Sequence, residues 1–222
     1  GLLREIIIAS TFGTSKGLDA VYLGLAVPTA IMLGLGGGAG RAIVPSGASL
    51  PQRDVGGLFF LAARRLMLLA APLALMMMAL SPAWSRWLLP PDGDVPARTL
   101  LFAAALGSLG IVGNAFAGMC IGLSNSQGRH LTAQITPFVY NAIIILSILL
   151  LTPMLGVFSL LVGIVLAEWG QTLALVPFLQ RIVRNYHFPS SPVLRGVEAL
   201  FWPSVMIAAV GGMLGAVDRY FA

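Results

Sequence analysis

The chain has 222 residues, of which 58% are hydrophobic and 9% are charged, and its mean hydropathy is +0.92. Soluble domains are roughly half apolar and a quarter charged, so this composition indicates an integral membrane protein. The formal net charge is +5, but most basic residues lie between apolar runs, which indicates membrane topology rather than a nucleic-acid partner. A single cysteine, Cys120, excludes an internal disulfide framework and a cysteine-cluster metal site. The two histidines, His130 and His187, lie far apart in polar stretches, so we expect neither a metal site nor a cofactor.

The apolar runs predict a truncated first helix and six longer ones, because a membrane-spanning helix needs about 20 mostly apolar residues. Residues 2–12 are too short to span, so we interpret them as the second half of a helix and the chain as a fragment. The glycines and hydroxyls of residues 13–17 predict a turn. The predicted fold class is all-α, a polytopic transmembrane helix bundle. The six longer helices are predicted at residues 18–44, 58–80, 98–123, 132–151, 155–179 and 198–222.

Prolines and glycines predict where these helices bend, end or pack. Pro28 and the glycine tract 34–40 predict a bend in the second helix, because proline removes a backbone donor and glycine lowers helix stiffness. Residues 81–96 predict a loop whose two tryptophans suit the membrane interface, and residues 152–153 predict a short turn. Glycines spaced by four predict close helix packing; they are Gly34/Gly38, Gly36/Gly40, Gly118/Gly122 and Gly211/Gly215.

Basic residues are divided unevenly between the two ends of the predicted helices. If the first segment leaves the cytoplasm, seven basic residues lie in or beside the loops on one side and three lie on the other. The richer side is predicted to face the cytoplasm, which places residues 81–96 outside. The seven are Arg53, Arg64, Arg65, Arg129, Arg181, Arg184 and Arg195, and the three are Lys16, Arg86 and Arg98.

Ionisable residues within membrane spans are costly and usually face a cavity or a partner. Each candidate also has a second interpretation. Asp19 would complement the positive end of a helix dipole, and Arg41 would extend its guanidinium to the cytoplasmic interface. Glu168 would form a hydrogen bond between helices, while Asp218 and Arg219 would mark the outer end of the last helix. The full set of candidates is Arg4, Glu5, Asp19, Arg41, Glu168, Asp218 and Arg219.

No Ser/His/Asp or Cys/His arrangement, paired-acid signature or Walker motif is visible in the sequence, so we do not predict an enzyme. The opening of the chain instead resembles the first two helices of the MurJ/MviN family, which belongs to the multidrug/oligosaccharidyl-lipid/polysaccharide (MOP) exporter superfamily. The residues that carry the resemblance are Gly1-Leu2-Leu3-Arg4-Glu5, Ala9, Phe12-Gly13, Asp19-Ala20, Pro28, Gly38-Ala39 and Val44-Pro45, followed later by Pro137, Asn141, Gln171 and Pro177.

The resemblance covers essentially the whole chain and is most specific in its first block. It implies two pseudo-symmetric six-helix lobes around a central cavity, with alternating access. Residues 1–196 are then expected to form the amino-terminal lobe, with its first helix truncated, and residues 197–222 to begin the second lobe. The family's best-known activity is flipping lipid II, and its relatives flip other polyprenyl-linked oligosaccharides or export drugs.

The resemblance also implies site residues. Arg4 and Asp19 fall on positions regarded as functionally important in the family, and Glu5 falls where an acidic residue follows that arginine. The family's cationic position after the proline of helix two falls here at Met32 and Leu33. Arg41 comes nine residues later, which we interpret as roughly the opposite side of an ideal helix. This departure favours a lipid-linked glycan other than lipid II, such as an exopolysaccharide precursor.

We therefore predict a flippase of the bacterial cytoplasmic membrane that moves a polyprenyl-diphosphate-linked glycan. Its expected partners are this substrate and the surrounding membrane lipids. Arg4 is expected to face the cavity between the lobes, with Asp19 or Glu5 within reach, and to bind the diphosphate or form an outer gate. The alternative is a MATE-like drug/cation antiporter, which should prefer acidic cavity groups such as Glu168. A third hypothesis, a scaffold or receptor without transport, leaves the buried charges without a role. Whether a coupling ion takes part stays open.

Overall fold

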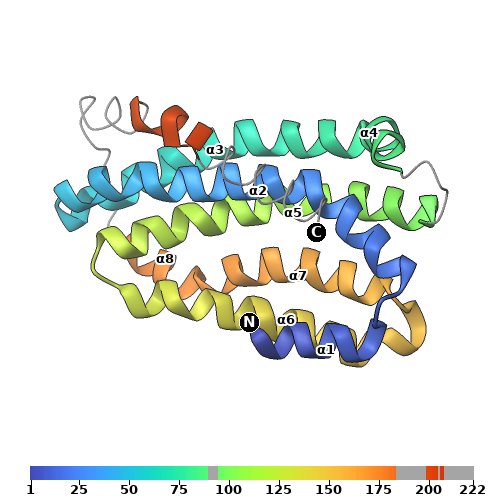
Figure 1. The fold of residues 1–222 in the computed structure, drawn as a ribbon. Coiled ribbons are helices and arrows are strands. Elements are labelled where there is room, and N and C mark those ends of the chain that lie inside the picture. The colour runs from blue at the N-terminus through green and yellow to red at the C-terminus, as the bar shows by residue number, and fades with distance from the viewer. Residues whose placement is uncertain (90–94, 184–198, 205, 208–222) are drawn as a thin grey trace.

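All regular secondary structure in the described residues is helical (Figure 1). The computed structural model describes residues 1–89, 95–183, 199–204 and 206–207. Five segments there are long and apolar enough to cross a membrane, so the predicted all-α membrane bundle is confirmed and the chain is a multi-pass membrane protein. The helices are α1 (Leu2–Phe12), α2 (Lys16–Ser49), α3 (Gln52–Ala79), α4 (Ser81–Leu88), α5 (Ala97–Ser126), α6 (His130–Leu155), α7 (Phe158–Ala174) and α8 (Val176–Val183).

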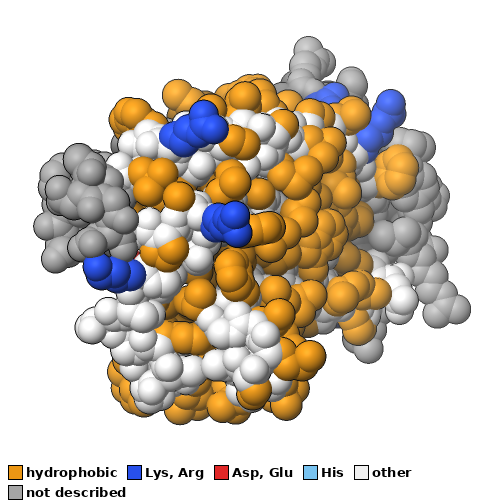
Figure 2. All heavy atoms as spheres, turned by 90° about the vertical axis from the view of Figure 1, so that its right-hand side faces the viewer, with side chains coloured by type: hydrophobic (Ala, Val, Ile, Leu, Met, Phe, Trp, Pro, Cys, Tyr) orange, Lys and Arg blue, Asp and Glu red, His pale blue; other side chains and the backbone are white. Residues whose placement is uncertain are grey.

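The long helices run side by side and alternate in direction. Figure 1 shows the α1–α2 turn, α4 and the α6–α7 turn at one end of the bundle, and the α2–α3 and α5–α6 turns at the other. This grouping matches the two sets of loops predicted from the basic residues; which end faces the cytoplasm stays a prediction. In Figure 2, which looks onto the first of these ends, hydrophobic side chains predominate and the basic side chains lie apart from one another.

Several predicted boundaries are wrong. The predicted turn at residues 152–153 lies inside α6, which continues to Leu155 and ends at Gly156 with a positive φ of 54°. Neighbouring helices and hydroxyl groups allow a proline to remain within a membrane helix, and glycine adopts positive φ without a Cβ penalty. The helix predicted at residues 155–179 is interrupted at Leu175, which separates α7 from α8.

Two further differences concern the second and third predicted helices. Both are longer than predicted, because α2 continues through Pro45 to Ser49 and α3 begins at Gln52. The predicted loop of residues 81–96 contains α4, whose Trp84 donates its indole N–H to the carbonyl oxygen of Met77 at 3.3 Å. Of the predicted seventh helix, residues 199–204 are helical; Asp218, Arg219 and most of that helix lie outside the described residues.

Helices α2 and α5 approach each other until their backbones touch. A methyl group added at Gly118 would overlap the carbonyl oxygen of Gly36, and one added at Gly122 would overlap that of Gly40. A methyl group at Gly40 would lie 2.8 Å from the carbonyl oxygen of Gly118. Close packing at these two glycine pairs is therefore confirmed, and it matches the use of small residues where membrane helices cross. Gly211 and Gly215 lie outside the described residues.

Helix α2 is unbroken, but its first turns are inclined to the remainder (Figure 1). Pro28 is the interior proline nearer to that end, and it is buried against Gly107 of α5. The predicted bend of this helix therefore agrees with its shape. Apolar side chains cover the outside of the bundle as well as its core; on α6, for example, Phe138 and Met154 are largely exposed. Such a surface suits contact with lipid.

Candidate functional site

A groove with a volume of about 750 Å³ follows the crossing of α2 and α5. Four of its lining residues carry polar side chains: Arg41 from α2, Asn114 and Asn125 from α5, and Gln171 from α7. The other lining residues are apolar or glycine and include Leu33, Val44 and Ile121. We call this hollow the α2–α5 groove. One cationic side chain and three amides between apolar walls make it the candidate binding site.

A second hollow, of about 400 Å³, lies among α2, α3, α5 and residues 199–204. Its lining is apolar except for Arg65. It brings no group of polar side chains together, so it is a weaker candidate than the α2–α5 groove for recognising a polar ligand.

The helical repeat explains which face of α2 lines the groove. Its groove residues are Leu33, Gly36, Gly37, Gly40, Arg41 and Val44. Each lies three or four residues from another member of the set, which is the spacing of one helix face. Met32 is 3% exposed and lies in the core, whereas Leu33 is 52% exposed and lines the groove. Arg41 therefore lies opposite Met32, as predicted, but it shares the groove face with Leu33, because eight residues correspond to a rotation of only about 80°.

Glu168 lies behind the groove wall, where α7 packs on α5. Its carboxylate is 4% exposed, and one of its oxygens, Oε2, accepts hydrogen bonds from Asn114 Nδ2 at 2.9 Å and from Gln171 Nε2 at 2.6 Å. We call these three residues the Glu168 cluster. The Tyr140 side chain of α6 interacts with the same carboxylate and lies within electrostatic range of Arg4. The predicted hydrogen bond between helices is confirmed for Glu168.

Glycine brings the two helices close enough for this cluster. A methyl group added at Gly113 would lie 2.9 Å from the carbonyl oxygen of Glu168. Beside it, the hydroxyl of Thr172 donates to the carbonyl oxygen of Gly113 at 2.9 Å. The contact between α5 and α7 therefore combines hydrogen bonds with a close approach of the two helices at Gly113.

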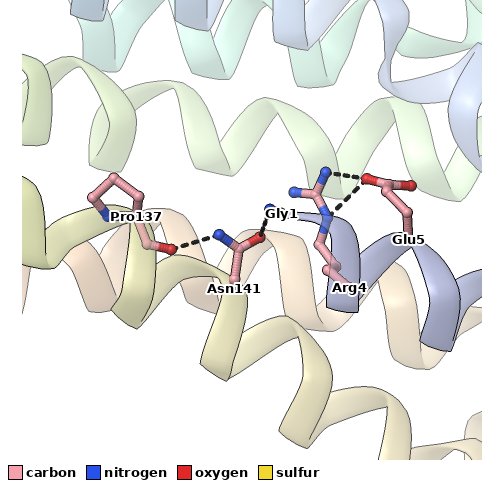
Figure 3. Close-up of polar contacts among 5 residues, drawn as sticks. All are labelled: Gly1, Arg4, Glu5, Pro137 and Asn141. Carbon is pink, nitrogen blue, oxygen red and sulfur yellow. Dashed lines mark hydrogen bonds and ion pairs between the residues drawn. The ribbon is translucent and has the colours of Figure 1, made fainter.

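Arg4 and Glu5 form an ion pair on α1 (Figure 3), and neither residue lines the groove. Arg4 Nε donates to Glu5 Oε1 at 3.0 Å, and Arg4 Nη2 contacts the same oxygen. The prediction that Glu5 lies within reach of Arg4 is thus confirmed. Although adjacent residues on a helix point in different directions, both side chains are long and partly exposed, so they can still meet.

The same view contains two of the four residues of the later resemblance, Pro137 and Asn141. Asn141 Nδ2 donates to the carbonyl oxygen of Pro137 at 2.6 Å, and its Oδ1 accepts from the amino group of Gly1 at 3.2 Å. Asp19 lies in the first turn of α2, after the N-cap Ser15, where a carboxylate complements the helix dipole. No contact between Arg4 and Asp19 is present among the described residues.

The structure therefore separates the five predicted site residues. Arg41 lines the groove, Glu168 supports its wall, and Arg4, Glu5 and Asp19 lie elsewhere. Sequence reasoning missed Asn114 and Asn125. Their amides interrupt an apolar helix eleven residues apart, which is about three turns. Helical periodicity combined with polarity could therefore have identified this face.

The sequence matches no protein-family model and no curated protein. The structure is similar to that of "Lipid II flippase MurJ, inward closed conformation", with a TM-score of 0.71 and 18% identity over 99% of this chain and 47% of that chain. It is also similar to an inward-facing multidrug resistance MATE family transporter of the MOP superfamily, with a TM-score of 0.61 and 15% identity over 99% of this chain and 55% of that chain. The chain spans about half the length of both proteins and has the fold of the corresponding part of a MOP-superfamily transporter.

Proposed function

We propose that the chain is the amino-terminal lobe of a flippase that moves a polyprenyl-diphosphate-linked glycan across the bacterial cytoplasmic membrane by alternating access. The observation that carries the proposal is the α2–α5 groove, in which one arginine and three amides lie between apolar walls. The similarity to a lipid II flippase supports it. The proposal makes the chain a transport protein rather than an enzyme.

The groove offers a complementary surface for each part of such an amphiphile. The planar guanidinium of Arg41 can donate two hydrogen bonds to one phosphate group. Asn114, Asn125 and Gln171 can exchange hydrogen bonds with sugar hydroxyls, and the apolar rim tolerates the prenyl chain. Arg41 and Leu33 line the same groove, which supports the proposal that Arg41 replaces the cation missing at Met32 and Leu33. Lipid II and an exopolysaccharide precursor are both proposed substrates.

We assign Arg4 to the cavity between the lobes as a second cationic group. Its pairing with Glu5 leaves it partly exposed, so a diphosphate could compete with Glu5 for the guanidinium. Arg4→Lys keeps the charge but loses the planar fork. If Arg4 binds or gates the substrate, this variant should insert in the membrane normally and lose transport, whereas normal transport would make the pair purely structural.

The alternative function is a drug/cation antiporter, and one observation favours it. Glu168 is a buried carboxylate directly behind the groove wall, and cationic substrates are attracted to such groups. The alternative would give Arg41 no ligand, since a cationic drug would be repelled by it. We therefore rank it second.

Transport in proteoliposomes separates the two functions. The full-length protein should move a fluorescent polyprenyl-diphosphate glycan and leave a cationic dye in place. Arg41→Ala should lower glycan transport by about tenfold or more, because hydrogen bonds between charged groups are lost, and Arg41→Lys should restore it only in part. Arg64→Ala is the matched control, since Arg64 is an exposed helical arginine outside the groove lining. Dye transport that depends on Glu168, with no glycan transport, would establish the antiporter instead.

A further inference from the structure

We infer that Glu168 is a positioning residue that fixes the hydrogen-bonding polarity of the α2–α5 groove, so that its wall accepts hydrogen bonds and selects a ligand rich in hydroxyl donors. The inference deepens the proposed function, on which its choice of ligand class rests. Its basis is that two of the three groove amides have the same buried partner.

The first step is the direction of the two hydrogen bonds. A carboxyl oxygen that carries no proton can only accept a hydrogen bond. Asn114 and Gln171 must therefore turn their nitrogens toward it, and both nitrogens lie within hydrogen-bond distance of Oε2. Each amide oxygen then lies on the side away from Glu168.

The second step is where that oxygen lies. A methyl group added at Gly36 would overlap Oδ1 of Asn114, so this oxygen is directed toward α2. Gly36 and Asn114 both line the groove. The carbonyl side of Asn114 is thus presented at the α2–α5 edge of the groove, and a side chain larger than glycine at Gly36 would cover it.

The third step is that, within the part of the chain that the structure describes, the Asn114 and Gln171 side chains have no hydrogen-bond partner other than Glu168. Asn114 and Gln171 come from different helices, and the polar partners of Glu168 among the described residues, which include Tyr140, are neutral. Without the carboxylate, either amide could rotate by half a turn and present its N–H groups to the groove. Glu168 thereby determines whether this part of the wall accepts or donates hydrogen bonds.

The chemical consequence is that two parts of the groove have opposite hydrogen-bonding roles. Arg41 donates, which suits an anionic group, and the wall set by Glu168 accepts, which suits the hydroxyl groups of a sugar. A ligand with a phosphate and a neighbouring sugar matches both parts. A bare anion matches Arg41 alone.

The test uses two neutral probes, so that it does not depend on diphosphate binding. Octyl glucoside and tetraethylene glycol monooctyl ether share an alkyl chain, but the glucoside carries several hydroxyl donors and the ether carries one. Binding of each probe, and of undecaprenyl diphosphate, would be measured by competition on the full-length protein in nanodiscs. The wild type should bind the glucoside more tightly than the ether.

Glu168→Gln keeps the side-chain shape but can donate as well as accept, so the two amides are no longer held in one orientation. It should lower the preference for the glucoside by about fivefold to tenfold, the range expected for one hydrogen bond. Asn114→Leu should lower it similarly, and the double variant should lower it little further, because both changes remove the same interaction. Thr172→Val removes a hydrogen bond from the same helix pair, outside the groove lining, and should leave the preference unchanged.

The outcomes separate the two proposals. No glucoside preference in the wild type, or an unchanged preference in Glu168→Gln, overturns the inference. Equal weakening of both neutral probes in Glu168→Gln also overturns it, since that result indicates a general structural role. A third outcome is that the wild type prefers the glucoside, Glu168→Gln loses that preference, and the wild type does not bind undecaprenyl diphosphate. This outcome counts against the proposed flippase and leaves the assignment of Glu168 standing.

Discussion

Helix α5 packs against α2 and α7 in physically different ways. Toward α2 it presents glycines, and the two backbones touch at the Gly36–Gly118 and Gly40–Gly122 pairs. Toward α7 it presents a side-chain amide and a backbone carbonyl, which bond to Glu168 and Thr172. The first contact depends on shape and tolerates no added atom. The second depends on hydrogen-bond partners, and the groove lies where the two contacts meet.

The largest effect is expected from filling the contact between α2 and α5. Gly118→Ala places a methyl group on the carbonyl oxygen of Gly36, so the helices must separate. We expect a loss of about 1–3 kcal/mol in the free energy of unfolding, as for overpacked cores. Thermal unfolding can be followed with a thiol-reactive dye, because Cys120 is the single cysteine of this chain and is buried.

Gly17→Ala is the matched control for that variant. A methyl group there meets Val157 at 3.4 Å, an ordinary contact distance, and alanine favours a helix by up to about 1 kcal/mol over glycine. Its stability should be unchanged or higher. Equal losses in the two variants would show that the backbone contact between α2 and α5 has no special sensitivity.

An intermediate effect is expected from Glu168→Leu. Removing the carboxylate leaves the amides of Asn114 and Gln171 without their acceptor, which should cost about 1–2 kcal/mol of unfolding free energy. The double variant with Asn114→Leu should lose less than the sum of the two single changes, because the second change removes one of the unpaired groups. Strict additivity, measured by the same thermal assay, would contradict the direct bond between the two residues.

The fold could be predicted from the sequence because long apolar runs leave few alternatives in a membrane, whereas the site could be predicted only in part. The close packing of the glycines of α2 and α5 could be predicted because a spacing of four places small residues on one helix face. The hydrogen-bond partner of Glu168 on α5 could not be predicted from the sequence. Asn114 lies 54 residues away, and only the packing of the helices brings the two side chains together. That Arg41 shares a face with Leu33 was not predicted, because its rotation was counted from Met32, which lies in the core.

A smaller effect is expected from Thr172→Val, which removes the second polar link between α5 and α7. Hydrogen bonds between membrane helices contribute about 0.6 kcal/mol on average, and the variant should lose that much unfolding free energy. Ser108→Ala is a suitable comparison, since the Ser108 hydroxyl bonds to Ala104 within α5 itself. A Thr172→Val loss larger than that of Glu168→Leu would make the backbone link the main support of the α5–α7 contact.

The smallest effect on stability is expected at the ion pair on α1. Arg4 and Glu5 lie on one helix and their side chains are 27% and 53% exposed, so water screens their attraction. Exposed ion pairs contribute about 0–1 kcal/mol, and because the pair itself links no two helices, Glu5→Gln should change the unfolding free energy by less than about 0.5 kcal/mol. The thermal assay used for the glycine variants measures this directly. A loss as large as that of Glu168→Leu would mean that the pair holds α1 against α6, the helix on which α1 packs.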